Sequence, residues 1–137
     1  MRIILTREVS EPDFIELYKS AGWWLDEYDL DTSFIKKIID GSFLFAAAVD
    51  ENGKTVAMGR VISDAVSDAY IQDVVVLPEF RKQGLGSEII RLLTAELQKN
   101  GIDWIGLIGE PGTESFYESL GFSVLNNFIP MKFKNSK

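Results

Sequence analysis

The chain has 137 residues, 46% of them hydrophobic, so it is long enough to bury a core and most simply forms one domain spanning residues 1–137. It contains neither cysteine nor histidine, which excludes disulfides, thiol catalysis and metal sites that use either ligand. Its formal net charge of -7 repels nucleic acid and favours a cationic small molecule as partner. The sequence lacks a membrane-length apolar stretch and a signal-peptide pattern, so we expect a soluble, cytoplasmic protein.

The predicted elements alternate between strands and helices, with no internal repeat and no linker. A short strand at 3–5 precedes two helices, the first between the N-cap Ser10 and Gly22 and the second between Ser33 and Gly41. The remaining elements are strands at 43–49 and 55–62 around an Asn-Gly turn, a strand at 69–77, a helix at 86–99, a strand at 104–108, a helix at 113–120 and a closing hairpin at 122–125 and 129–133.

The order of these elements, βααβββαβαββ, predicts the fold class. Hairpin connections predict antiparallel pairs, whereas the strand–helix–strand unit between residues 69 and 108 predicts a parallel pair. We therefore expect an α/β (α+β) fold with a mixed central sheet of six to seven strands flanked by about four helices.

The most informative segment joins the strand at 69–77 to the long helix. It contains two cations, Arg81 and Lys82, and two glycines, Gly84 and Gly86, directly at the start of the helix. Unpaired N–H groups at a helix N-terminus attract anions, and glycines let the backbone approach them closely. The local residues thus predict a phosphate site, with a plain turn and solvated cations as an equal alternative.

The sequence lacks two other phosphate-binding motifs. A dinucleotide fingerprint needs a third glycine where Ile89 stands, and the Gly-Lys-Ser/Thr of a Walker loop occurs nowhere in the chain. These failures argue against a nucleotide-binding module of another fold.

The remaining pattern, Arg/Gln-x-x-Gly-x-Gly/Ala between a strand and a long helix, is met by residues 81–86. Here the sequence resembles the GNAT superfamily of acyl-CoA-dependent N-acyltransferases. Residues 116–122, Phe-Tyr-Glu-Ser-Leu-Gly-Phe, are similar to a second family motif, Phe-Tyr-x-x-x-Gly-Phe. The detailed resemblance covers residues 71–122, and upstream only the order of elements and a Trp after the first helix agree.

The resemblance implies a donor site for acetyl-CoA. The fourth and fifth strands would be parallel and splayed, so that pantetheine lies between 74–77 and 104–108 and pairs with the backbone of the fourth strand. The CoA pyrophosphate would bind the loop amides. The implied donor-binding residues are Val74, Val75, Val76, Arg81, Lys82, Gln83, Gly84, Leu85, Gly86 and Ser87.

The resemblance also implies direct attack of a neutral amine on the thioester, which needs a base, an oxyanion donor and an acid. The resemblance assigns Tyr117 as the acid near the thioester sulfur. The alternative role of Tyr117 is to pack the short helix onto the sheet. A backbone N–H near Val76 would donate a hydrogen bond to the oxyanion. Asp73 is the candidate base or acceptor ligand, although strand alternation can point it away. Glu110 stands where many relatives have Asn, and its alternative role is a plain turn.

The acceptor site is expected in the N-terminal half. Between the first two helices, Trp23, Trp24 and Tyr28 stand among acidic residues and suit a cationic amine, with anchoring of the helices as the alternative. Arg60 either binds a substrate carboxylate or pairs with Asp64 or Asp73.

The sequence therefore predicts an N-acetyltransferase that uses acetyl-CoA as co-substrate and a small amine as acceptor. The alternatives are a protein or peptide amine as acceptor, and a non-catalytic module that senses acyl-CoA. No metal, nucleic-acid or membrane partner is expected, and edge strands are compatible with a homodimer.

Overall fold

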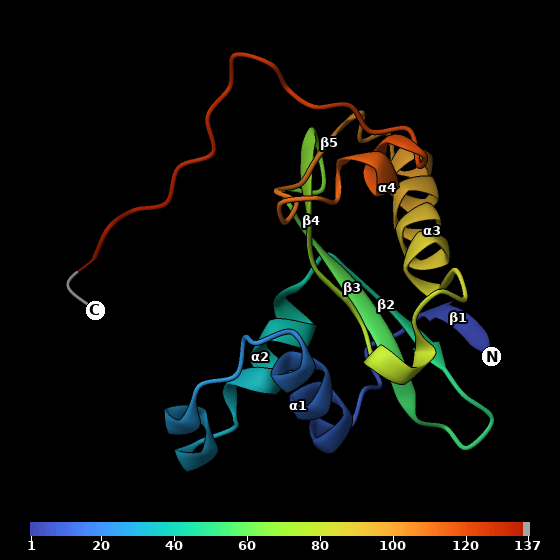
Figure 1. Cartoon of the computed structure of the whole chain (residues 1–137), viewed down its shortest axis with the longest axis vertical. Helices are drawn as coiled ribbons and strands as arrows, with labels where there is room; N and C mark the ends of the chain where they lie inside the picture. Colours follow the sequence, from blue (N-terminus) through green and yellow to red (C-terminus); the bar gives the residue numbers. More distant parts are fainter. Residues whose placement is uncertain (136–137) are drawn as a thin grey trace. The chain divides into compact units, whose positions relative to one another are not determined.

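Five strands form one mixed sheet in a computed structural model that describes residues 1–135 (Figure 1). Contacts divide the chain into two units, Met1–Leu107 and the part from Ile108 onward, and the sheet belongs to the first. The strand order follows the chain: β1 (Arg2–Leu5), β2 (Leu44–Val49), β3 (Thr55–Ser63), β4 (Asp68–Val76) and β5 (Trp104–Gly106).

The pairs β1–β2, β2–β3 and β3–β4 are antiparallel, and the pair β4–β5 is parallel. The hairpin between β2 and β3 turns at Asp50–Lys54, as the Asn-Gly pair predicted. The parallel pair confirms the prediction for the strand–helix–strand unit. It is short, because β5 pairs only with Asp68, Ala69 and Tyr70 of β4.

Helices cover both faces of this sheet. α1 (Glu11–Ser20) and α2 (Phe34–Gly41) lie on one face, and α3 (Leu85–Lys99) lies on the other (Figure 1). The 3-10 turns η1 (Asp26–Leu30) and η2 (Pro78–Phe80) lie between α1 and α2 and between β4 and α3.

The alternation of side chains along β3 explains how both faces are used. A Cβ on Gly59 would lie 2.8 Å from Ile89 and 3.3 Å from Leu93, so Gly59 lets α3 pack closely against the sheet. The next residue, Arg60, points to the other face, where its side chain meets a network that reaches α1 through Tyr18.

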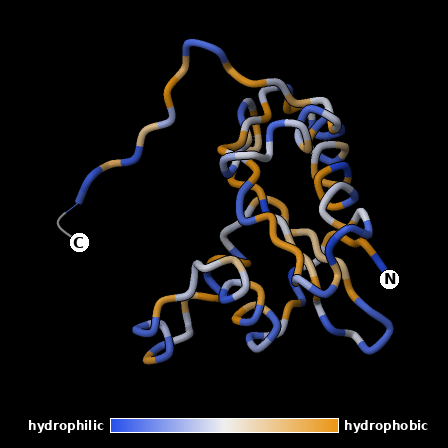
Figure 2. Tube along the Cα trace, in the orientation of Figure 1, coloured by the Kyte–Doolittle hydropathy of each residue, from blue (hydrophilic) through white to orange (hydrophobic). Residues whose placement is uncertain are grey.

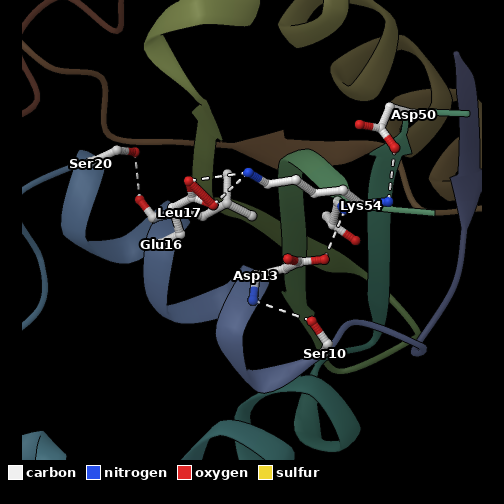
Figure 3. Close-up of polar contacts among 8 residues, drawn as sticks. Ser10, Asp13, Glu16, Leu17, Ser20, Asp50 and Lys54 are labelled. Carbon is white, nitrogen blue, oxygen red and sulfur yellow. Dashed lines mark hydrogen bonds and ion pairs between the residues drawn. The ribbon is translucent and has the colours of Figure 1, made fainter. Parts of the chain in front are cut away.

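Polar contacts attach α1 to the hairpin of β2 and β3 (Figure 3). The Ser10 hydroxyl caps the Asp13 N–H at 3.2 Å, as predicted, and the Asp13 carboxylate accepts a hydrogen bond from the Thr55 N–H at 3.0 Å. Lys54 Nζ lies 2.9 Å from a Glu16 carboxylate oxygen. These contacts fix α1, and with it Tyr18, relative to the sheet.

One apolar side of α3 forms the core against the sheet. Its residues Ile89, Ile90, Leu93 and Leu97 are fully buried. Among residues 1–135, no helix is both long enough and apolar enough to cross a membrane.

The second unit contains α4 (Glu114–Glu118), close to the predicted short helix. The predicted closing hairpin at 122–125 and 129–133 is wrong, because the described residues after α4 form neither strand nor helix. Within residues 1–135 the sheet therefore has five strands rather than six to seven, whereas the four α-helices there match the prediction.

The local sequence explains why the hairpin pattern was misleading. Apolar residues recur on both sides of Asn126 and Asn127 in this segment, which is largely hydrophobic in Figure 2, and this composition suggested two strands around a turn. Pro130 removes a backbone donor from the second predicted strand, and Asn127 has a φ of 69°, unlike extended backbone. The segment's large apolar side chains stay 55% to 86% exposed: Val124, Leu125, Phe128, Ile129, Met131 and Phe133.

Candidate active site

The two neighbours of β4 pair with different lengths of it. β3 pairs with β4 up to Val76, whereas β5 stops at Tyr70. Among the described residues, no strand therefore pairs with Ile71–Val76 on the β5 side. Apart from the Val76 carbonyl, which accepts a hydrogen bond from Arg81, the backbone groups on that edge are available to an extended ligand that carries amides of its own. The resemblance implied a separation of the two parallel strands beyond this point, and the early end of their pairing is compatible with it.

A β-bulge lies where β4 leaves β5. Met58 pairs with Val75 and Arg60 pairs with Gln72, so that two residues of β4 oppose the single residue between them on β3. One of these two, Asp73, has a φ of 54°, in the left-handed region. The bulge thus sets the position of everything downstream on β4.

The Asp73 side chain joins a polar network from three elements. Its Oδ2 accepts hydrogen bonds from the Tyr18 hydroxyl at 2.5 Å and from Arg60 Nε at 2.7 Å. Arg60 Nη1 also donates to the Ser42 hydroxyl at 3.5 Å. The side chains of Arg60 and Asp73 are only 15% and 21% exposed, so this ion pair is largely shielded from water.

This geometry decides between the pairings left open for Arg60. Its partner is Asp73, because the Asp64 carboxylate instead accepts hydrogen bonds in its own turn. Backbone N–H groups of Ser67 and Val66 lower the pKa of Asp64 to about 2. A substrate carboxylate would therefore have to compete with Asp73 for the Arg60 guanidinium.

Tyr18 keeps its proton in this network. Burial is the main cause that raises the pKa of Tyr18 far above its usual value, and the hydrogen bond to Asp73 raises it further. The hydroxyl is therefore a donor to Asp73 at neutral pH.

The loop after β4 has the backbone geometry of an anion site. Lys82 and Gly84 have φ values of 63° and 80°, and Gly84 is the N-cap of α3 without a side-chain cap. The first turn of α3 is closed by the Glu88 N–H, which donates to the Gly84 carbonyl at 3.0 Å. The amides of residues 85–87 precede this bond and stand at the positive end of the helix dipole.

Arg81 has a second role that the sequence did not predict. Its Nε donates to the Val76 carbonyl at 3.0 Å. The side chain therefore attaches the loop to the end of β4, in addition to bringing positive charge to the loop.

Tyr117 lies in α4 of the second unit and packs among neighbours of that unit. Its ring lies 5.0 Å from the Phe116 ring and 5.9 Å from the Phe122 ring, and a Cβ on Gly109 would lie 3.3 Å from it. Burial, followed by the negative charge of Glu110, raises the pKa of Tyr117. The phenol therefore holds a proton at neutral pH, which an acid must do. Its ring contacts also agree with the alternative role, which is packing of the short helix.

The acceptor-site candidates fall into two groups. Trp24 and Tyr28 form an aromatic cluster with Phe34 of α2, with ring centroids 5.0 to 5.7 Å apart. Trp23 instead lies edge-on to the Tyr18 ring at 5.3 Å, and so borders the network of Asp73 and Arg60.

Sequence reasoning missed Tyr18 and Ser42 as members of this network. Tyr18 lies within the predicted first helix, but no polar role was predicted for it. A hydroxyl on an apolar stripe was the available signal, because a buried Tyr normally needs a hydrogen-bond partner. Ser42, only 3% exposed, gave no comparable signal.

Comparison with known proteins identifies the class of protein that this fold and site define. The model of the acetyltransferase (GNAT) domain matches residues 40–124. An uncharacterized N-acetyltransferase, ycf52, of Pyropia yezoensis is 30% identical over 135 residues, which cover 88% of this chain and 78% of the relative. The chain therefore belongs to the GNAT acetyltransferase family, a family of acyltransferases.

Two further comparisons describe the neighbourhood within this family. Serotonin N-acetyltransferase 2, chloroplastic, of Oryza sativa subsp. japonica is 37% identical over 78 residues, which cover 57% of this chain and 39% of that relative. A GNAT-family acetyltransferase structure from Streptococcus pneumoniae TIGR4 superimposes with a TM-score of 0.82 at 24% identity, covering 99% of this chain and 98% of that one. The second comparison supports the fold alone.

Proposed function

We propose that this chain transfers the acetyl group of acetyl-CoA to the amine of a small acceptor. The observation that carries the proposal is the continuity of two backbone features. The unpaired edge of β4 ends at Val76, and η2 and a short loop lead from there to the glycine-containing start of α3. The edge suits the amides of pantetheine, and the loop amides suit a pyrophosphate.

Each donor residue has a role in this proposal. The backbone of Val74, Val75 and Val76 pairs with pantetheine, and the loop from Arg81 to Gly86 binds the pyrophosphate. Lys82, Gln83, Gly84 and Leu85 contribute mainly backbone groups there, and Ser87 lies on the first turn of α3.

The transfer forms one N–C bond and breaks one C–S bond. The backbone N–H near Val76 stabilises the oxyanion that develops on the thioester carbonyl. Tyr117 donates its phenolic proton to the departing CoA sulfur and regains a proton from solvent. Asp73 serves as base or acceptor ligand on the amine side. Since its Oδ2 already accepts two hydrogen bonds, this role falls to Oδ1 or to a water that Oδ1 holds.

A small cationic amine is supported by charge and by the acceptor segment. The net charge is -7, and η1 carries exposed Asp26 and Glu27 beside the aromatic cluster of Trp24 and Tyr28. The name of the rice relative adds aromatic ethylamines to the acceptors worth testing. A protein amine and a non-catalytic sensor of acyl-CoA are the competing proposals.

Two accompanying proposals concern the setting of the protein. A homodimer would cover exposed sheet edges, and a cytoplasmic location fits a chain without cysteine. Gel filtration with light scattering tests the first, and fractionation of cells tests the second.

The experiment combines binding with turnover. Titration calorimetry with acetyl-CoA, and with ATP and NAD as controls, should give micromolar binding of acetyl-CoA alone. Thiol release is then measured against small amines, aromatic ethylamines and a lysine peptide. Release that depends on a small amine supports the proposal, and release with the peptide alone supports a protein acceptor. Binding without release supports the sensor, and absence of binding overturns the donor site.

A further inference from the structure

The β-bulge at Asp73 is held by side chains from two other elements. The Tyr18 hydroxyl from α1 and the Arg60 guanidinium from β3 both donate to the same carboxylate oxygen of Asp73. We propose that Tyr18 and Arg60 are positioning residues, which hold Asp73 in its left-handed conformation and so set the backbone of Val74–Val76 for acyl-pantetheine. This inference rests on the proposed function.

The bulge needs such support because its backbone conformation is unfavourable. A non-glycine residue with a φ of 54° lies in a sparsely populated region, although Asp tolerates it better than most residues. A conformation of this kind persists where the surroundings fix it. Here a shielded ion pair and a buried hydroxyl provide the fixation, from residues 13 and 55 positions away in the chain.

Because one edge of β4 is unpaired, the bulge largely determines the backbone position that acyl-pantetheine would meet. On the β5 side, no strand within the described residues fixes the backbone of Val74–Val76. On the β3 side, the pairing resumes only after the bulge, with Met58 opposite Val75 and Ala57 opposite Val76. Loss of the bulge would shift this register by one residue and turn the backbone groups of β4 to other directions.

The support is itself rigid. α1 is attached to the β2–β3 hairpin by Asp13, whose carboxylate binds the Thr55 N–H, and by the Glu16–Lys54 ion pair (Figure 3). Phe14 stacks on the Tyr18 ring at 4.2 Å, so that the hydroxyl has little freedom to follow a displaced Asp73. The network therefore transmits the position of α1 to β4.

The test separates the two halves of the donor. In Tyr18→Phe we expect acetyl-CoA to bind about 10- to 140-fold more weakly, the loss typical of a hydrogen bond to a charged group. The affinity for 3'-phospho-ADP, which lacks the pantetheine, should stay unchanged because the loop and the start of α3 are untouched. Titration calorimetry with each ligand gives the two affinities.

The matched control is Tyr70→Phe, which removes the hydroxyl of an exposed tyrosine on the same strand. It should change neither affinity. Equal weakening of both ligands in Tyr18→Phe would overturn the inference, since it would show a general structural loss. Unchanged binding of acetyl-CoA would overturn it too. If the unmodified protein fails to bind acetyl-CoA, the proposed function fails instead.

A second measurement reads the strand directly and does not depend on ligand. Hydrogen exchange at the amides of Val74–Val76 should be faster in Tyr18→Phe and in Arg60→Gln than in the unmodified protein, while exchange in the centre of α3 stays the same. Asp73→Asn, which tolerates positive φ, should retain more acetyl-CoA affinity than Asp73→Val, in which a β-branched residue resists it. Equal affinities in these two variants would contradict the role of the bulge.

Discussion

The segment from β4 to the start of α3 and the segment around η1 offer a ligand different things. The first presents an unpaired strand edge, two residues with positive φ in the loop and helix-start amides, which are all features of the backbone. The second presents Trp24, Tyr28 and exposed carboxylates. Under the proposed function, the donor would therefore be bound mainly by backbone groups, and the acceptor mainly by side chains.

This difference predicts how substitutions divide between the two sides. Changes that alter backbone conformation or loop charge should weaken the binding of the donor. Side-chain changes around η1 should alter only the binding of the acceptor. The predictions below test this division and the chemistry between the two substrates, from the largest expected effect to the smallest.

Tyr117→Phe should have the largest effect, because it removes the proposed acid and leaves the ring packing in place. We expect kcat to fall by about 10²–10⁴-fold with little change in acetyl-CoA affinity. Because burial and the charge of Glu110 raise the pKa of Tyr117, the phenol stays protonated and active beyond the pH at which an ordinary tyrosine loses its proton, and its contribution falls only at still higher pH. A pH profile of kcat equal in both proteins would remove Tyr117 from the mechanism.

Arg81→Gln should weaken acetyl-CoA binding by about 1.5–3 kcal/mol if the guanidinium contacts a phosphate. Loss of its hydrogen bond to the Val76 carbonyl acts in the same direction. Calorimetry measures the change, and Lys99→Gln, at the far end of α3, controls for the loss of one positive charge. Equal affinities of the unmodified protein and Arg81→Gln would sink the pyrophosphate assignment.

Gly84→Val tests the backbone conformation of the loop without a steric clash. A Cβ at this position meets nothing within 4 Å, but the φ of 80° disfavours any β-branched residue. We expect a loss of about 1–2 kcal/mol in acetyl-CoA binding. Gly84→Asn, which adopts positive φ more readily, should lose less, and the reverse order would show that the conformation of the loop is not what matters.

Trp24→Ala should have the smallest effect and should be confined to the acceptor. If the indole contacts a cationic amine, the acceptor KM should rise by a few-fold, equivalent to about 0.5–1 kcal/mol. In Trp24→Phe the acceptor KM should stay close to that of the unmodified protein, and in both variants the KM for acetyl-CoA should not change. A parallel rise in both KM values would assign Trp24 to packing against Phe34 instead.

Local sequence signals predicted the elements around the proposed donor site. The strand at 69–77, the glycines at the helix start and the long helix at 86–99 each depend on short-range features, and the structure has all three. Their agreement reflects the fact that helix starts and turns are determined by a few adjacent residues.

Long-range features escaped prediction. The Tyr18–Asp73 hydrogen bond joins residues 55 positions apart, and no periodicity reports such a contact. The hairpin predicted at 122–133 is wrong for a local reason as well: Pro130 lacks a backbone donor and Asn127 has a positive φ, and both disfavour paired strands there.

The hydrogen bond from Arg81 to the Val76 carbonyl joins the end of the strand to the start of the phosphate loop. It keeps a constant separation between the place where a thioester would lie and the place where a pyrophosphate would lie. Under the proposed function, this fixed separation would favour a donor of matching length. Short acetyl thioesters such as acetyl-cysteamine would contact only the strand edge, and free nucleotides would contact only the loop. Intact acetyl-CoA would contact both and would therefore bind most tightly.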